Sequence, residues 1–172
     1  MTAPGIQSRV GQVLTVGSAY HHIANATERF LGTSRGNPVA FARTAFAAGA
    51  TAVFGHGPHV MRAAEWRGEQ LVFYSLGNLL TYGPFRNREP QDRGAVACVV
   101  VEAPRKITAA ELRPTRQLMA GALTGDSTGR ALTLVDSLSA LDFPRTGVTV
   151  APDGTIGRRD AAVIRANPPR RR

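Results

Sequence analysis

The sequence predicts an α/β fold, and three features of the chain support that prediction. A β-branched run at residues 12–16 is followed by helical spacing at residues 37–49 and by an apolar run at residues 51–54. This strand–helix–strand order is typical of a βαβ unit with parallel strands. A hairpin pattern follows it. A nearly continuous apolar run at residues 95–102 then predicts a strand that is buried on both faces of a sheet.

The helix expected at residues 37–49 has clear start and stop signals. Asn37 suits the N-cap, Pro38 suits the first helical position and Gly49 suits the end of a helix. The preceding residues, 17–36, show no apolar periodicity and are expected to form a loop.

Shorter elements are expected after the βαβ unit. Residues 63–66 and 70–74 flank a glycine-containing turn and predict a β-hairpin. Residues 81–93 are rich in turn formers and charges, which indicates a long surface loop. Residues 107–112 are expected to pair with the apolar strand, and residues 113–125 are expected to be irregular.

The last part of the domain is expected to contain one helix and one hairpin. Asp126 or Ser127 is the predicted cap of a helix with apolar residues at helical spacing. Residues 147–150 and 155–158 flank the turn Pro152-Asp153-Gly154 and predict a terminal hairpin. The apolar helical residues are Leu132, Val135, Leu138 and Leu141.

Composition limits the class of protein. The chain has 172 residues, enough for one domain or part of one, and its 43% apolar residues are enough to build a core. The formal net charge is +9, and Lys106 is the only lysine, so arginine supplies nearly all the positive charge. Arginine pairs with carboxylates and phosphates, although a GC-rich genome would favour the same bias. Cys98 is the only cysteine, which excludes an intrachain disulfide and a cysteine zinc site.

Domain boundaries are expected near both ends. Residues 1–11 are expected to be disordered, residues 12–160 to form the domain, and residues 161–172 to form a basic disordered tail. No apolar run reaches the roughly 18 residues that a membrane span needs. Residues 1–5 lack the basic and apolar segments of a signal peptide. A cytoplasmic location is therefore the default expectation, unless an exporting segment lies elsewhere in the gene product.

The four histidines fall into two pairs, His21 with His22 and His56 with His59. The second pair lies in a glycine-rich turn directly after a short apolar strand, where open α/β sheets place their ligands. Neutral imidazole is a common metal ligand, so this turn predicts a site for one ion or two. The same spacing also suits two histidines that only satisfy backbone groups in a tight turn.

Residues 48–80 extend this turn into a longer pattern. They contain the sequence GHGPHV at residues 55–60, then the predicted hairpin, then YSLGN at residues 74–78. Two motifs joined by the right hairpin are far more specific than either alone. Residues 48–80 closely resemble the pattern of the CapA-type proteins of bacterial capsule and poly-γ-glutamate synthesis, and the resemblance covers roughly residues 12–102.

The resemblance implies a partial calcineurin-like metallophosphoesterase fold, a sandwich of β-sheets flanked by helices whose front half is missing from this chain. It implies that His56 and His59 are catalytic ligands of a divalent metal site. Manganese, iron, zinc and magnesium are the metals expected there. An earlier family histidine falls near His21 and His22, where His22 is the better match, although two exposed loop histidines explain this pair equally well.

Two motifs of the family's front half are absent from the chain. They are a Gly-Asp motif and an Asn-Asn-His motif, and no aspartate precedes Asp92. A two-metal phosphoesterase site holds ions about 3.5–4 Å apart and needs carboxylates to neutralise them. We therefore expect an incomplete metal site and little or no turnover by this chain alone. A missing N-terminal half, a partner chain that completes the site, or a decayed paralogue would each account for the absence.

Other residues have expected roles around this site. Asn78 is expected to cap the turn after its strand, to orient a ligand histidine or to bind the substrate. Arg62 and Arg86 are candidates for binding an anionic substrate, or are simply solvated. Ser75 lacks the G-x-S-x-G context of a nucleophilic serine. Cys98 is expected to be inert core packing.

The resemblance thus implies a metal-dependent hydrolase linked to capsule or poly-γ-glutamate synthesis, acting on a phosphorylated substrate. A non-catalytic basic scaffold that binds an acidic polymer is the alternative. A third interpretation is a metal-dependent peptide-modifying relative on the same fold. The chain has no nucleic-acid fold signature and few aromatic residues, so no specific nucleic-acid partner is expected.

Overall fold

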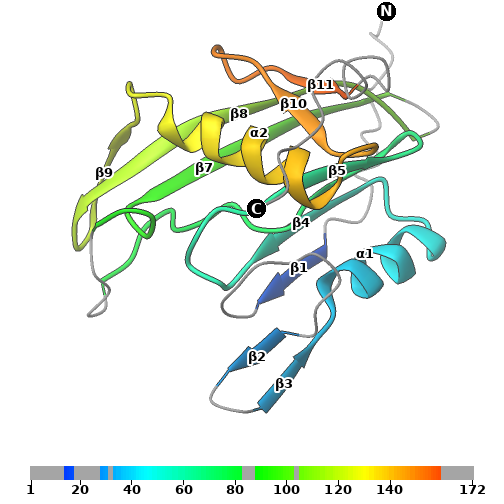
Figure 1. Cartoon of the computed structure of the whole chain (residues 1–172), viewed down its shortest axis with the longest axis horizontal. Coiled ribbons are helices and arrows are strands. Elements are labelled where there is room, and N and C mark those ends of the chain that lie inside the picture. Colours follow the sequence, from blue (N-terminus) through cyan, green and yellow to red (C-terminus); the bar gives the residue numbers. More distant parts are fainter. Residues whose placement is uncertain (1–13, 18–27, 31–32, 83–87, 103–104, 160–172) are drawn as a thin grey trace, which may run out of the picture.

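The fold is mixed α/β, as predicted (Figure 1). A computed structural model describes residues 14–17, 28–30, 33–82, 88–102 and 105–159, which form two helices and four sheets. The first half contributes β1 (Leu14–Gly17), β2 (Glu28–Phe30), β3 (Thr33–Gly36), α1 (Pro38–Ala47), β4 (Ala52–His56), β5 (Ala64–Arg67) and β6 (Gln70–Phe73). The second half contributes β7 (Arg93–Glu102), β8 (Lys106–Met119), β9 (Ala122–Gly125), α2 (Arg130–Asp142), β10 (Val148–Val150) and β11 (Ile156–Arg158).

The first sheet has the strand order β1-β4-β6-β5. β1 and β4 are parallel, as the strand–helix–strand order predicted, and Gly17 pairs with His56. β6 is parallel to β4, whereas β5 is antiparallel to β6 and forms the predicted hairpin with it. The carboxyl ends of β1, β4 and β6 therefore lie at one edge of the sheet, and His56 is at that edge.

Helix α1 covers one face of this sheet. The Asn37 side chain accepts a hydrogen bond from the Ala40 amide at 3.0 Å, which confirms the predicted N-cap. Gly49 has a φ of +97°, a conformation that suits glycine and ends the helix. The apolar side of α1 joins alternate residues of β4 and β6 in one buried cluster. Its members are Val39, Ala42, Ala45, Phe46, Ala50, Val53, Ala63, Val72 and Tyr74.

The opposite face of the same sheet contributes to a larger buried cluster. Phe54 and Phe73 point to this side and stack with ring centroids 5.7 Å apart. Helix α2 and the antiparallel sheet β7-β8-β9 supply the other side of this cluster. The members from α2, β7 and β8 are Ala131, Leu132, Val135, Ala95, Ile107, Ala110 and Leu112. The described chain thus places apolar layers on both faces of the first sheet.

Three expectations for β7 and its neighbours were wrong. Val96 and Val100 of β7 are 41% and 54% exposed, so this strand is not buried on both faces by the described residues. Cys98 is only partly buried, so it is not a core residue. Residues 113–125 are not irregular, because β8 continues to Met119 and β9 pairs with it.

Two local predictions also need correction, and a third was correct. The region 17–36 contains the antiparallel pair β2 and β3 instead of forming only a loop. Helix α2 begins after Gly129, which makes no side-chain cap, so neither Asp126 nor Ser127 is its N-cap. The terminal hairpin of β10 and β11 was predicted correctly.

The two ends predicted to be disordered, residues 1–11 and 161–172, lie outside the described residues. Within the described part of the chain, neither helix has the length and apolar character needed to span a membrane.

Candidate functional site

The two sequence motifs meet at the carboxyl edge of the first sheet. The Leu76 amide donates a hydrogen bond to the Gly55 carbonyl at 3.1 Å, which joins the GHGPH segment to the YSLGN segment. A Cβ atom on Gly55 would lie 2.3 Å from the Tyr74 carbonyl oxygen, so this contact requires glycine. The sequence analysis placed His56 in the turn after the strand, but in the structure it is the last residue of β4.

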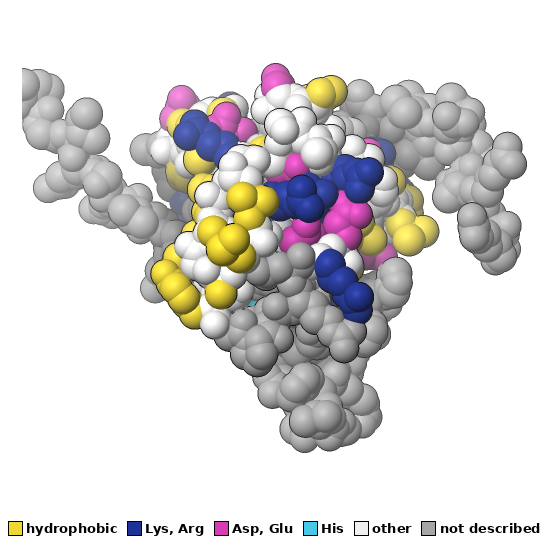
Figure 2. Space-filling view, turned by 90° about the vertical axis from the view of Figure 1, so that its left-hand side faces the viewer, with side chains coloured by type: hydrophobic (Ala, Val, Ile, Leu, Met, Phe, Trp, Pro, Cys, Tyr) yellow, Lys and Arg dark blue, Asp and Glu magenta, His cyan; other side chains and the backbone are white. Residues whose placement is uncertain are grey.

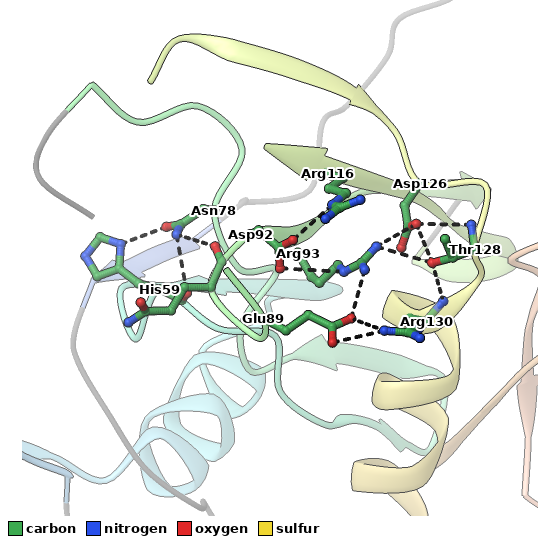
Figure 3. A network of polar contacts seen from close by, with 10 residues as sticks. His59, Asn78, Glu89, Asp92, Arg93, Arg116, Asp126, Thr128 and Arg130 are labelled. Carbon is green, nitrogen blue, oxygen red and sulfur yellow. Dashed lines mark hydrogen bonds and ion pairs between the residues drawn. The ribbon is translucent and has the colours of Figure 1, made fainter. Parts of the chain in front are cut away.

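His59 is held in an uncommon backbone conformation. Its φ is +58°, the left-handed region, which costs energy for a residue with a Cβ atom. Its side chain is partly buried, and its Nδ1 atom lies 2.7 Å from Oδ1 of Asn78 (Figure 3). The turn therefore directs this imidazole toward the strand end that carries the second motif.

Asn78 determines which nitrogen of His59 carries the proton. The Asn78 Nδ2 group donates to the Gln91 carbonyl at 2.9 Å and to the His59 carbonyl at 3.4 Å. These two acceptors fix the amide so that its oxygen faces His59. Because that oxygen only accepts, Nδ1 of His59 must be the donor, and in the neutral ring Nε2 carries the lone pair. Asn78 thus orients a histidine, which is one of the roles that the sequence suggested.

His56 is suited to the neutral form. Its side chain is partly buried at the strand end. Burial lowers the pKa of His56 from its usual 6.5, because desolvation disfavours the charged imidazolium. A neutral imidazole is the form that binds metal ions.

Behind Asn78 lies a buried ion-pair network that sequence reasoning missed (Figure 3). Arg93 has a side chain only 4% exposed and contacts Asp126 at 2.7 Å, Glu89 at 2.8 Å and Asp92 at 3.6 Å. Arg116 pairs with Asp92 at 3.0 Å. Arg93 neutralises the buried carboxylates of Asp92 and Asp126. Because Asp126 precedes α2, this ion pair connects residues 88–93 to the region before that helix.

The pKa values of this network follow from its contacts. Burial opposes the charge on Arg93, but hydrogen bonds to Glu89 and Asp126 outweigh that effect and raise the pKa of Arg93. Burial likewise opposes the charge on Asp126, and hydrogen bonds from Thr128 and Arg93 outweigh it and lower the pKa of that carboxyl. Figure 2 shows arginine and acidic side chains gathered at one end of the molecule, beside apolar side chains. Exposed apolar residues where β8 ends and β9 begins include Leu118, Met119 and Leu123.

Tight backbone contacts bring this network to Asn78. Gly77 and Gly94 form an antiparallel bridge. A Cβ atom on Gly94 would lie 2.0 Å from the Asn78 carbonyl oxygen, and one on Gly77 would lie 2.4 Å from the Arg93 carbonyl oxygen. The end of the YSLGN segment is thus packed directly on the start of β7.

The remaining predicted residues have different positions. Arg62 is only 5% exposed, so it is not a solvated surface arginine. Arg86, His21 and His22 lie outside the described residues. Ser75 is 1% exposed and follows β6, and its carbonyl accepts a hydrogen bond from the Arg62 amide at 3.1 Å.

Tyr74 of the second motif has a structural contact. Its hydroxyl donates to Glu65 at 2.8 Å, and its ring stacks on Phe143 with centroids 5.1 Å apart. Glu65 also accepts hydrogen bonds from Arg67 and Thr146. Burial, and then the nearby Glu65 charge, raise the pKa of Tyr74, so its hydroxyl stays protonated.

The donor set fits a metal ion only in part. Two neutral imidazoles are suitable ligands for one divalent ion of the zinc or manganese type. However, the described residues contain no group of three or more histidine, cysteine, aspartate or glutamate side chains that could hold a metal. A two-metal centre needs carboxylates, so the described residues do not fit one.

Comparison with known families identifies the segment that contains both motifs. Residues 20–82 match the family model described as bacterial capsule synthesis protein PGA_cap. This match confirms the resemblance to the CapA-type family, and it spans the GHGPH turn, the hairpin and the YSLGN segment. A comparison with curated proteins gave no match.

Proposed function

Since residues 20–82 of this chain carry the bacterial capsule synthesis family pattern, we propose that the chain provides the histidine part of a metallophosphoesterase-like site. In this proposal the described sheets are the C-terminal part of a calcineurin-like sandwich, and the site serves capsule or poly-γ-glutamate synthesis. The observation that supports it best is the Asn78–His59 hydrogen bond, because it fixes the tautomer that a metal ligand needs.

The proposal assigns a role to each site residue. His56 and His59 would bind one divalent ion through neutral imidazoles, with His22 as a further ligand. Asn78 would hold His59 in place, since its amide is already engaged by His59 and Gln91. A divalent ion in this position would polarise a phosphoryl oxygen of the substrate.

An incomplete set of metal ligands would limit the phosphoesterase activity of this chain when it acts alone. The described residues place no metal-binding group of histidines with carboxylates at this turn, so two divalent ions there would bring four positive charges together without neutralisation. Arg62 would add a positive charge near the turn, which suits an anionic substrate. We therefore expect a single ion to bind and no phosphoesterase turnover unless a second chain or segment supplies carboxylates.

Calorimetric titration of manganese and zinc into the purified chain tests the metal site. Each of His56→Ala and His59→Ala should weaken binding by about tenfold or more. His22→Ala should do the same, whereas His21→Ala should leave binding unchanged and serves as the matched control. Circular dichroism should show that all four variants remain folded.

A phosphatase assay with p-nitrophenyl phosphate tests the second part. We expect no metal-dependent turnover above the buffer rate. Robust turnover that His56→Ala abolishes would show that the site is complete and would refute this part of the proposal. Equal metal affinity in the wild type and both His56 and His59 variants would refute the assignment of the ligands.

A further inference from the structure

A second open site lies at the opposite end of the first sheet. A cavity of about 400 Å³ is lined by Trp66, Glu69, residues 106–110 of β8 and residues 156–158 of β11. The hairpin pairing of Arg67 with Gln70 places Trp66 and Glu69 at the amino-terminal end of the parallel strands. The cavity is therefore remote from His56, which ends β4.

Two strand edges form the walls of this cavity. β8 pairs with β7 along residues 106–116, but β9 occupies its other side only along residues 115–119. β11 pairs with β10 on one side. The residues just before β11 meet β8 in the bridge between Glu111 and Thr155, where the Leu112 amide donates to the Gly154 carbonyl at 2.9 Å. Among the described residues, no strand pairing between β8 and β11 itself follows this bridge. Figure 1 shows β11 lying beside this first part of β8.

The lining itself indicates that backbone faces the cavity. Five consecutive residues of β8 and three consecutive residues of β11 contribute to it. Successive side chains of a strand point to opposite faces, so side chains from one face alone cannot produce an unbroken run. The backbone edges of both strands therefore line the opening, and such an edge can accept a further strand through main-chain hydrogen bonds.

The floor of the cavity is aromatic and its rim is mainly cationic. The Trp66 indole donates to the Gly157 carbonyl at 3.0 Å, and the Arg158 guanidinium lies 4.2 Å from the Trp66 ring centroid. Arg158 also donates to the Gly68 carbonyl at 2.7 Å. Lys106 is exposed at the rim. The acidic lining residue is Glu69, 3.5 Å from Arg158, so the lining carries two cations and one carboxylate.

We propose that this cavity binds an acidic peptide in an extended conformation, added as a strand along the edge of β8. Main-chain hydrogen bonds would supply affinity, and the peptide's carboxylates would pair with Lys106 and Arg158. The volume lies within the range of about 300–1,000 Å³ found for ligand pockets. This inference is independent of the proposed metal site, because it requires neither a metal ion nor His56 and His59.

Trp66 makes the proposal directly testable, because it is the only tryptophan in the chain. The experiment follows Trp66 fluorescence during titration with a short peptide that alternates glutamate and valine. We expect a saturable change in emission, and no change with a peptide in which lysine replaces glutamate. A peptide that alternates glutamate and proline keeps the charge but lacks half of the amide donors, and it should bind about tenfold more weakly.

Charge-reversal variants locate the binding. Lys106→Glu should weaken the glutamate–valine peptide by about tenfold. Arg88→Glu makes the same charge change at an exposed position next to the Arg93 network and should leave affinity within about twofold. Metal addition should not alter binding. The proposal is overturned if the peptide leaves Trp66 emission unchanged, if the proline peptide binds equally well, or if both variants lose the same affinity.

Discussion

The Asn78 amide gives the most informative single perturbation of this protein. It is 5% exposed, accepts from Nδ1 of His59 at 2.7 Å and donates to the Gln91 carbonyl at 2.9 Å. Asn78→Ala removes all of these contacts at once. A buried polar group left without its partner costs about 1–3 kcal/mol. The two groups affected, the His59 imidazole and the Gln91 carbonyl, both belong to partly buried residues, so we expect a loss of about 1–3 kcal/mol of unfolding free energy.

The same variant should also weaken metal binding. A group that orients a ligand histidine is worth about 10–100-fold in metal affinity. Without the Asn78 oxygen, the imidazole of His59 can rotate and adopt either tautomer, so both the direction and the availability of its lone pair are lost. Urea unfolding measures the first effect, and calorimetric titration of manganese and zinc measures the second.

Gln117 provides a matched control for this experiment. It is also a buried amide, 1% exposed, which donates to the Thr81 carbonyl and accepts from the Thr81 hydroxyl, each at 2.7 Å. Gln117→Ala should destabilise the fold by a similar amount and leave metal affinity unchanged. If Asn78→Ala costs less than about 0.5 kcal/mol, the assigned hydrogen bonds are wrong. If both variants reduce metal affinity equally, Asn78 has no specific role in orienting His59.

Three further outcomes follow from the described contacts. Because burial lowers the pKa of His56 below 6.5, a falling pH protonates this imidazole in the unfolded chain before it does so in the folded chain. The neutral, buried His56 therefore contributes stability that is fully present above pH 6.5 and is lost as the pH falls through the lower folded-state pKa. Urea unfolding of the wild type and of His56→Gln across this pH range should show this loss of stability only in the wild type. Arg93→Met leaves buried carboxylates uncompensated and should cost about 3–5 kcal/mol in urea unfolding; a cost under about 1 kcal/mol would refute the network's importance. Tyr74→Phe removes the hydroxyl that donates to buried Glu65 and should lower the urea midpoint by an amount equivalent to about 1–3 kcal/mol, and an unchanged midpoint would contradict this.

The sequence predicted local elements best where residues have strong conformational or hydrogen-bonding preferences. Asn37, Pro38 and Gly49 delimit α1 because each has a conformational or hydrogen-bonding preference that suits one end of a helix. The parallel pairing of β1 and β4 followed from the strand–helix–strand order. These signals are local, so they survive without knowledge of tertiary contacts.

The errors arose where tertiary contacts override local patterns. Residues 113–125 contain arginine, threonine and glutamine, and this polarity concealed the end of β8 and all of β9. Yet Thr115 and Gln117 are buried, and the Gln117 amide forms hydrogen bonds with Thr81 from another segment. Asp126 matched a helix cap by type, but it is engaged by Arg93 and Thr128 instead.

The candidate site was also predicted only in part. The motif spacing predicted that His56 and His59 form one site beside Asn78, and the structure shows the contact between His59 and Asn78. It contained no signal for the contact between Asn78 and the Gln91 carbonyl, because that contact depends on the close approach of Gly77 and Gly94. Charged residues at 88–93 looked like a solvated loop, whereas Asp92 and Arg93 are 1% and 3% exposed.

The packing of Asn78 between the GHGPH turn and the first residues of β7 gives the domain a cooperative character. Opening the turn would break the contact with Gln91 and disturb the junction of two sheets, so the amides of Leu76 and Ala95 should exchange with deuterium only when the molecule opens as a whole. Any ligand that binds His59 would then slow exchange at both of these amides. At a concentration one hundred times its dissociation constant, it would stabilise the entire domain by about 2.7 kcal/mol.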